Sequence, residues 1–172
     1  MFIIGITGKA RSGKDTFAKH FINNGWFRYG FADPIKAACS AIFDWDNNDK
    51  DKDSVDPYFE VSPRVAYQTL GTEWGRNLIN PNLWILVANN KLKNHHRIII
   101  PDVRFENEAA FVRKNGILIH MKRSNIMQVA KHKSEEGIKH KSGDIIVNNN
   151  GDIPSLNLEA SKIRIRIENT YL

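Results

Sequence analysis

The sequence predicts an α/β fold with a mostly parallel sheet, and two observations support this. Short runs of apolar, β-branched residues typical of buried strands alternate with segments whose apolar residues recur at helical spacing. The clearest strand-like runs are 2–6, 97–100, 117–121 and 145–147. The second observation is a glycine-rich loop between the first run and the first helical segment. With 172 residues, the chain is long enough for one domain with a real core.

The glycine-rich loop runs from Gly8 to Thr16 and has the spacing of a phosphate-binding loop. Gly8 and Gly13 allow the backbone to curl round an anion, and the helix that follows adds unpaired N–H groups and its positive dipole end. Lys14 is then placed to contact the outer phosphates of a nucleoside triphosphate. The alternative is a solvated glycine-rich turn, which leaves the spacing, the lysine and the flanking strand and helix unexplained.

The position after Lys14 departs from the general motif, which has Ser or Thr there to hold Mg²⁺. Asp15 stands at that position and Thr16 comes one residue later. A carboxylate is a hard oxygen ligand for Mg²⁺, whereas an acid in the first helical turn also interacts favourably with the helix dipole. Both roles stay open for Asp15, as does the choice between Asp15 and Thr16 as the residue nearer the metal.

A second candidate metal ligand, Asp102, follows the strand-like run Arg97–Ile100. Because the carboxyl ends of parallel strands face the ligand crevice in such sheets, Asp102 is a candidate for direct or water-mediated contact with Mg²⁺. The alternative is that Asp102 caps the helix that starts near Glu106.

The composition limits the possible classes of function. The net charge of +6 and the isoelectric point of about 9.5 suit nucleic acid, and they also suit a site for two polyphosphate ligands. The lone cysteine, Cys39, excludes an internal disulfide and is expected to pack in a helix. No apolar segment is long enough for a membrane span and no cleavable leader is evident, so we expect a cytoplasmic protein.

The remaining segments follow local signals. We expect a strand at 27–31, a helix from Pro34 capped by Asp33, a helix from Pro63 capped by Ser62, and further helices after Asn80–Pro81 and from 153 to 172. Two polar segments, 44–56 and 124–141, are expected to be mobile. The acids between 44 and 56 lack the glycine and terminal glutamate of a calcium loop, and the pair at 95–96 is expected to be exposed histidines in a turn.

Several blocks in this order resemble one known group, the deoxynucleoside monophosphate kinases of tailed bacteriophages. These blocks are Gly8 to Thr16 with its Lys-Asp-Thr ending, 31–36 (FADPIK), 63–76 (PRVAYQTLGTEWGR), 102–108 (DVRFENE), 132–135 (HKSE) and 144–148 (DIIVN). The glycine loop alone is common to many families, whereas the joint order of the blocks is far more specific. The resemblance runs nearly end to end.

The resemblance implies a three-layer P-loop NTPase fold of the adenylate-kinase type over residues 1–172. It implies a monophosphate-binding region at about 32–80 and a lid at about 123–141. It further implies transfer of the γ-phosphate of ATP to a deoxynucleoside monophosphate, with Mg²⁺, to give the diphosphate and ADP for DNA precursor synthesis. A phage-encoded protein would act in the host cytoplasm, and relatives are often homodimers.

Site residues follow from the resemblance position by position. ATP would be held by Arg11, Gly13, Lys14, Asp15 and Thr16. The monophosphate would be held by Lys9, Ile35, Lys36, Arg64, Gln68 and Trp74. The candidate metal ligands are Asp15, Thr16 and Asp102, and the cations for the transferring phosphate are Lys14, Arg64, Arg104 and Arg123. The lid departs from the family pattern, because Arg123 is followed by lysines at 131, 133, 139 and 141 where arginines are usual.

Two aromatic side chains, Phe31 and Trp74, could contact the base, and core packing is the alternative for each. Other functions also fit part of the pattern. One alternative is a different small-molecule P-loop kinase, acting on a coenzyme precursor or a phosphorylated alcohol. Another is a nucleic-acid-binding switch, which the charge permits but which lacks a guanine signature and an aromatic-studded basic strand. We expect neither a membrane nor a nucleic acid partner. Base preference is not predicted by the sequence.

Overall fold

The computed structural model describes residues 1–45, 51–124 and 137–172. It divides them into two compact units, one formed by Met1–Tyr29 with Leu92–Leu172 and the other by Gly30–Lys91. The middle of the acidic segment and most of the predicted lid, with the lysines at 131 and 133, lie outside the described residues.

The first unit contains a five-stranded sheet in the order β2-β3-β1-β4-β5, and all the strand pairs are parallel. The strands are β1 (Phe2–Thr7), β2 (Phe27–Arg28), β3 (Arg97–Ile100), β4 (Gly116–Lys122) and β5 (Ile145–Asn148). The predicted α/β fold with a mostly parallel sheet is thereby confirmed.

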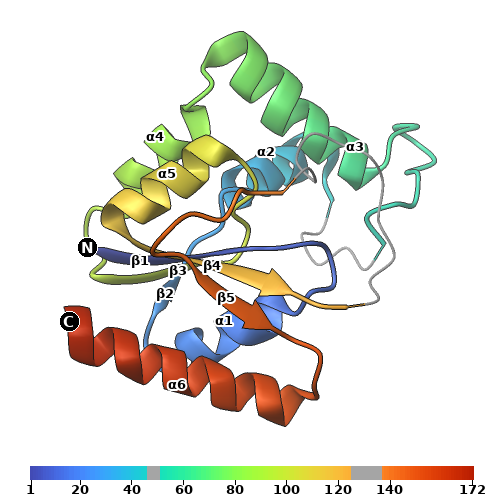
Figure 1. Ribbon diagram of the computed structural model, residues 1–172. Coiled ribbons are helices and arrows are strands. Elements are labelled where there is room, and N and C mark those ends of the chain that lie inside the picture. The colour runs from blue at the N-terminus through green and yellow to red at the C-terminus, as the bar shows by residue number, and fades with distance from the viewer. Residues whose placement is uncertain (46–50, 125–136) are drawn as a thin grey trace. The chain divides into compact units, whose positions relative to one another are not determined.

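Helices cover both faces of this sheet, so the first unit has three layers (Figure 1). On one face lie α1 (Lys14–Ile22) and α6 (Ile153–Tyr171), which pack with Ile4 and Ile6 of β1 in the main core. Gly5 points to the other face, towards Val112 of α5 (Glu106–Asn115). The alternation of side chains along β1 therefore separates the two helical layers.

The strand predicted at 27–31 is shorter in the structure, where β2 covers only Phe27–Arg28. The N–H of Tyr29 still donates to the carbonyl of Ile99, at 3.0 Å. The N–H of Gly30 instead donates to the Asp33 carboxylate, at 2.8 Å, and so the chain leaves the sheet and turns. Phe31 is buried, which favours core packing for this side chain over contact with a base.

The second unit is helical, with α2 (Asp33–Phe43), α3 (Pro63–Gln68), η1 (Thr69–Ile79) and α4 (Leu83–Lys91). Ser62 caps α3 as predicted, since its Oγ accepts from the Val65 N–H at 3.4 Å. Asp33 is the first residue of α2 and not its cap, a shift of one position. Cys39 is buried in α2, and burial raises the pKa of its thiol.

The element η1 is a π-helix, which the sequence pattern did not predict. The backbone N–H of Asn80 bonds the carbonyl of Gly75, five residues earlier, at 3.0 Å. Because a π-helix turns through a smaller angle per residue than an α-helix, its side chains point in other directions than those of an α-helix over the same residues. Trp74 is 44% exposed, whereas Gly75 and Arg76 are buried. Gly75 is needed there, since a Cβ would come within 2.7 Å of the Trp84 ring.

The described ends of the acidic segment make specific contacts with aromatic side chains and with backbone N–H groups. Trp45 stacks on Phe43, and its indole N–H donates to the Asp56 carboxylate at 2.8 Å. Asp56 also accepts from the N–H groups of Tyr58 and Phe59, and these hydrogen bonds lower the pKa of its carboxyl group. In the described ranges, no helix has the length and apolarity to cross a membrane.

Candidate active site

The loop between β1 and α1 has the backbone geometry of an anion cradle. Arg11 and Gly13 have φ angles of 62° and 95°, in the left-handed region that an L side chain rarely adopts. Where residues with a positive φ alternate with residues with a negative φ, successive backbone N–H groups point towards a common point. Gly13 is also the N-cap of α1, so the free N–H groups of the helix face the same side.

Lys14 lies folded against this loop. Its Nζ donates to the carbonyls of Gly8 and Lys9, at 2.8 and 2.7 Å. These two hydrogen bonds hold the ammonium group against the loop.

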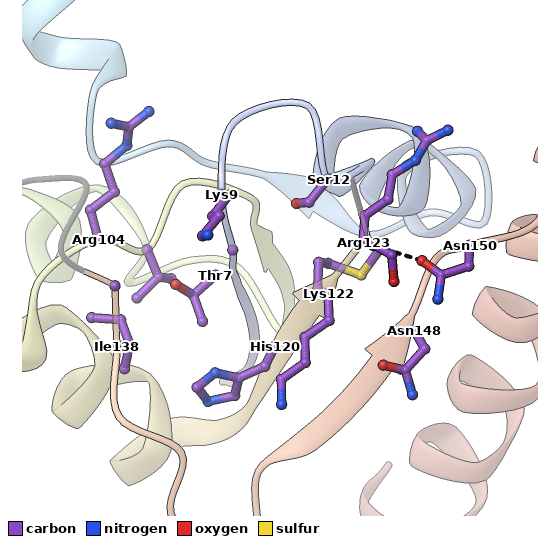
Figure 2. Close-up of a pocket in the computed structure, with 15 residues that line it drawn as sticks. Thr7, Lys9, Ser12, Arg104, His120, Lys122, Arg123, Ile138, Asn148 and Asn150 are labelled. Carbon is purple, nitrogen blue, oxygen red and sulfur yellow. Dashed lines mark hydrogen bonds between the residues drawn. The ribbon is translucent and has the colours of Figure 1, made fainter. Parts of the chain in front are cut away.

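A cavity of about 530 Å³ opens beside the loop, inside the first unit. Its walls come from the loop, from the last residues of β1, β4 and β5, from residues that follow β3, β4 and β5, and from Gly137 and Ile138 (Figure 2). Among the described residues, four cationic side chains line it: Lys9, Arg104, Lys122 and Arg123. A cavity with this many cations, at the carboxyl ends of parallel strands, suits a polyanionic ligand.

A charged network around Asp144 contacts His120, one of the residues that line the cavity. This carboxylate is 1% exposed and accepts from Arg113 Nε at 2.9 Å and Nη2 at 2.8 Å. It also contacts His120 Nε2 at 2.9 Å and accepts from the N–H of Lys141 at 2.9 Å. Burial would raise the pKa of Asp144, but the hydrogen bonds from Arg113, Lys141 and His120 outweigh it and hold that pKa well below its usual range.

The candidate metal ligands lie in the first unit. Asp15 and Thr16 are in the first turn of α1, and Asp15 is exposed. Asp102 follows β3, whose neighbour in the sheet is β1, and the next residue, Val103, donates to the carbonyl of Ile6 at 3.1 Å. Within the described residues, no group of three or more His, Cys, Asp or Glu side chains could hold a metal by itself.

That donor set nevertheless fits Mg²⁺, which commonly takes one or two carboxylates and completes its shell with water and phosphate oxygens. The alternative in which Asp102 caps α5 was wrong. The N-cap is Phe105, whose N–H donates to the Glu108 carboxylate at 3.0 Å.

The predicted monophosphate-binding residues other than Lys9 lie in the second unit. Arg64 and Gln68 stand one turn apart on α3, and both are partly buried. The guanidinium of Arg64 pairs with the Asp53 carboxylate, through Nε to Oδ1 and through Nη2 to Oδ2. Lys36 is partly buried and Trp74 is exposed on η1. Ile35 is 8% exposed and packs against Gly71, so its side chain belongs to the core of this unit.

The structure therefore brings together in one cavity only part of the predicted set, namely Lys9, Arg104 and Arg123. Sequence reasoning missed His120 and Asp144, whose polar side chains at the ends of strand-like runs were the available signal. It also missed the asparagines at 148–150, of which Asn148 and Asn150 line the cavity and Asn149 bonds the phosphate-binding loop. No signal in the sequence indicated Arg113, because an arginine in the last turn of a helix is ordinarily exposed to solvent.

Comparison with known proteins places these features in a family. A family model described as deoxynucleotide monophosphate kinase matches residues 53–160. A protein of Acanthamoeba polyphaga mimivirus named "Putative deoxynucleotide monophosphate kinase" is 31% identical over 156 residues, covering 78% of this chain and 81% of the relative. The deoxynucleoside-5'-monophosphate kinase of Escherichia phage T5 is 30% identical over 88 residues, which is 45% of this chain and 35% of the phage protein.

Solved structures match the fold over nearly the whole chain. Dephospho-CoA kinase from Campylobacter jejuni has a TM-score of 0.56 and 13% identity, covering 99% of this chain and 98% of that protein. TT1252 from Thermus thermophilus has a TM-score of 0.55 and 16% identity, with 98% of each chain covered. At these identities the likeness concerns the fold.

Proposed function

Since this chain belongs to the deoxynucleotide monophosphate kinase family, we propose that it transfers the γ-phosphate of ATP to a deoxynucleoside 5′-monophosphate. The products are the deoxynucleoside diphosphate and ADP. The donor binds at the loop from Gly8 to Thr16, through Arg11, Gly13, Lys14, Asp15 and Thr16. The acceptor is held by Lys9 and by Lys36, Arg64, Gln68 and Trp74, and Ile35 contributes to the packing of the unit that carries the last four.

One observation supports this assignment most strongly. The anion cradle, with Gly13 at the start of α1 and Lys14 folded over its carbonyls, opens beside a cavity lined by four cationic side chains. A donor with several phosphates needs this combination, because backbone N–H groups and lysine hold the outer phosphates while further cations offset the remaining charge.

The chemistry requires no general base from the protein. The attacking atom is a phosphate oxygen that is already anionic near neutral pH, so catalysis depends on position and on stabilisation of charge. Lys14, Arg64, Arg104 and Arg123 supply positive charge to the transferring group. Removal of such a cation from a phosphoryl-transfer site costs on the order of 10³-fold in rate.

Magnesium ion, bound together with the nucleotide, would neutralise charge on the phosphate oxygens. Asp15, Thr16 and Asp102 are the residues that would hold it, either directly or through water. Asp15 and Thr16 follow Lys14 directly in the first turn of α1, so one helical turn supplies both a phosphate contact and the metal contact.

The two remaining parts of the proposal concern the acceptor region and the lid. We assign the monophosphate to residues of about 32–80, within the unit Gly30–Lys91. We assign the lid to about 123–141, where Arg123, Lys139 and Lys141 are the described cations. A lid that excludes water would limit wasteful hydrolysis of ATP.

The test is a coupled assay of ADP release with ATP and magnesium across dTMP, dGMP, dCMP and dAMP and the ribose forms of these acceptors. We expect turnover with at least one deoxynucleotide above the rate without acceptor. Failure with every monophosphate, together with turnover of a coenzyme precursor or a phosphorylated alcohol, would establish a different small-molecule kinase. The same panel measures base preference and discrimination between deoxyribose and ribose.

A further inference from the structure

The turn between β5 and α6 contains three consecutive asparagines, at 148–150, and two of them bond to segments that form the cavity. Asn149 is 6% exposed, and its side-chain amide Nδ2 donates to the carbonyl of Ser12, at 2.9 Å. Ser12 lies in the phosphate-binding loop, 137 residues away along the chain. This contact ties the loop to the far edge of the sheet.

We propose that Asn149 is a positioning residue for the donor site: it fixes the phosphate-binding loop in the conformation that receives the triphosphate of ATP. The proposal rests on the function assigned above to that loop.

The packing round Gly13 supports this role. A Cβ added at Gly13 would lie 2.3 Å from Nδ2 of Asn149, so the asparagine amide sits directly against the backbone of the loop. Gly13 has a φ of 95° and is the N-cap of α1. Asn149 therefore touches the two consecutive residues, Ser12 and Gly13, at which the loop turns into the helix.

Asn149 is itself held firmly. Its backbone N–H donates to the carbonyl of Lys122, the last residue of β4, at 2.7 Å. The next residue, Asn150, accepts from the N–H of Ser124 through its side-chain oxygen at 2.8 Å (Figure 2). The turn thus binds both the loop and the segment that carries Arg123, and it fixes two walls of the same cavity relative to each other.

The side chain of Ser12 gives a further reason why its position matters. Ser12 is one of the residues that line the cavity, and its hydroxyl is buried and has no hydrogen-bond partner in the part of the chain that the structure describes. A buried polar group without a partner is costly, and a ligand oxygen or nitrogen in the cavity would satisfy it. By holding the carbonyl of Ser12, Asn149 also sets where this hydroxyl lies.

The test uses Asn149→Asp and Asn149→Ala. The first keeps the shape of the side chain and replaces its donor by an oxygen, and the second removes the donor without adding charge. Each is compared with Asn157→Asp, which makes the same charge change on an exposed position of α6. Measured are the KM values for ATP and for the best monophosphate, kcat, the affinity for a fluorescent ATP analogue, and the thermal unfolding midpoint.

We expect kcat/KM for ATP to fall roughly 10- to 100-fold in both Asn149 variants, because a misplaced positioning group costs about this much. Affinity for the ATP analogue should fall in parallel, while the monophosphate KM stays within about twofold of wild type. Asn157→Asp should behave as wild type. A lower unfolding midpoint with unchanged ATP affinity and unchanged KM values would overturn the proposal, since it would mean a purely structural asparagine.

An effect in Asn149→Asp without one in Asn149→Ala would also overturn it, because charge and not the lost hydrogen bond would then be the cause. If Asn149→Asp fails to fold, Asn149→Ala decides the question alone. Failure of the proposed function is seen separately, as wild-type protein that turns over no monophosphate. The binding measurement still tests Asn149 in that case.

Discussion

Lys14 and Arg64 are the two cations that the proposed reaction depends on most, and the structure holds them in different ways. Lys14 Nζ donates to two neutral carbonyl oxygens of its own loop. Arg64 pairs with a full carboxylate, that of Asp53, from a segment 11 residues earlier. Arg64 is thus engaged by a full negative charge, whereas these two contacts of Lys14 are to carbonyl dipoles.

This difference has an energetic consequence. A phosphate that reaches Lys14 could displace the two carbonyl contacts, which carry no net charge, and a charge-assisted contact is stronger than these. A phosphate that reaches Arg64 must compete with an anion already in the fork of the guanidinium. Binding of the monophosphate at Arg64 would therefore exchange one anion for another.

Lys14→Ala is the largest expected change. Turnover should fall on the order of 10³-fold, because removal of a preorganised charge contact to the transferring phosphate costs roughly this much. Since Lys14 is not part of the core, the unfolding midpoint should stay near that of wild type. Steady-state kinetics and thermal unfolding measure both, with Lys19→Ala, an exposed lysine of the same helix, as the control. Turnover close to that of wild type would remove the loop from the mechanism.

Arg64→Ala should weaken binding of the acceptor far more than binding of ATP. A charge-assisted hydrogen bond is worth about 1.5–3 kcal/mol, so the monophosphate KM should rise roughly 10- to 100-fold while the KM for ATP changes little. Arg64→Lys should recover part of the loss, since lysine keeps the charge but lacks the planar fork. Arg166→Ala, on an exposed position of α6, is the matched control. An unchanged monophosphate KM would show that the acceptor lies elsewhere.

Much of the donor side could be predicted from the sequence because its signals are local. The run Phe2–Ile6, the glycine loop and the helix from Lys14 are consecutive, and each obeys a short-range rule. The buried strand Arg97–Ile100 was equally clear from its β-branched residues. The cap at Ser62 was predicted from two adjacent residues.

What could not be predicted depends on contacts distant in sequence or on unusual backbone. Asp144 meets Arg113 and His120 only because β4, β5 and α5 come together in the first unit. The pairing of Arg64 with Asp53 requires a particular path of the segment between them. The π-helix η1 has no composition signal, and a pattern based on 3.6 residues per turn cannot give the directions of its side chains.

Substitution of Asp144 tests whether its hydrogen-bond network stabilises the first unit. Asp144→Asn keeps the shape but removes the charge that Arg113 and His120 face, so the free energy of unfolding should fall by about 1–3 kcal/mol. Chemical denaturation measures this, with Glu159→Gln on an exposed position of α6 as the control. An unfolding free energy equal to that of wild type would mean that the network adds no support.

The contribution of Asp144 to the free energy of unfolding should depend on pH in one direction. Because the pKa of Asp144 is lower in the folded protein than in the unfolded chain, its stabilising contribution is complete above about pH 5 and is lost as the pH falls. The difference between wild type and Asp144→Asn should therefore shrink on acidification. A difference that stayed constant from neutral pH down to about pH 3 would contradict the low folded pKa.

Asp53→Asn should have the smallest effect and addresses the acceptor side directly. If the carboxylate of Asp53 competes with the monophosphate for Arg64, its removal should lower the monophosphate KM. The side chains of Asp53 and Arg64 are 65% and 30% exposed, and such pairs contribute about 0.2–1 kcal/mol, so the decrease should be about 1.5- to 5-fold. The KM for ATP should not change, and neither should either KM in Glu60→Gln, an exposed acid of the same unit. A rise in the monophosphate KM would show instead that Asp53 orients Arg64 for the acceptor. Asp53 would then favour binding of the monophosphate at Arg64 and would not compete with it.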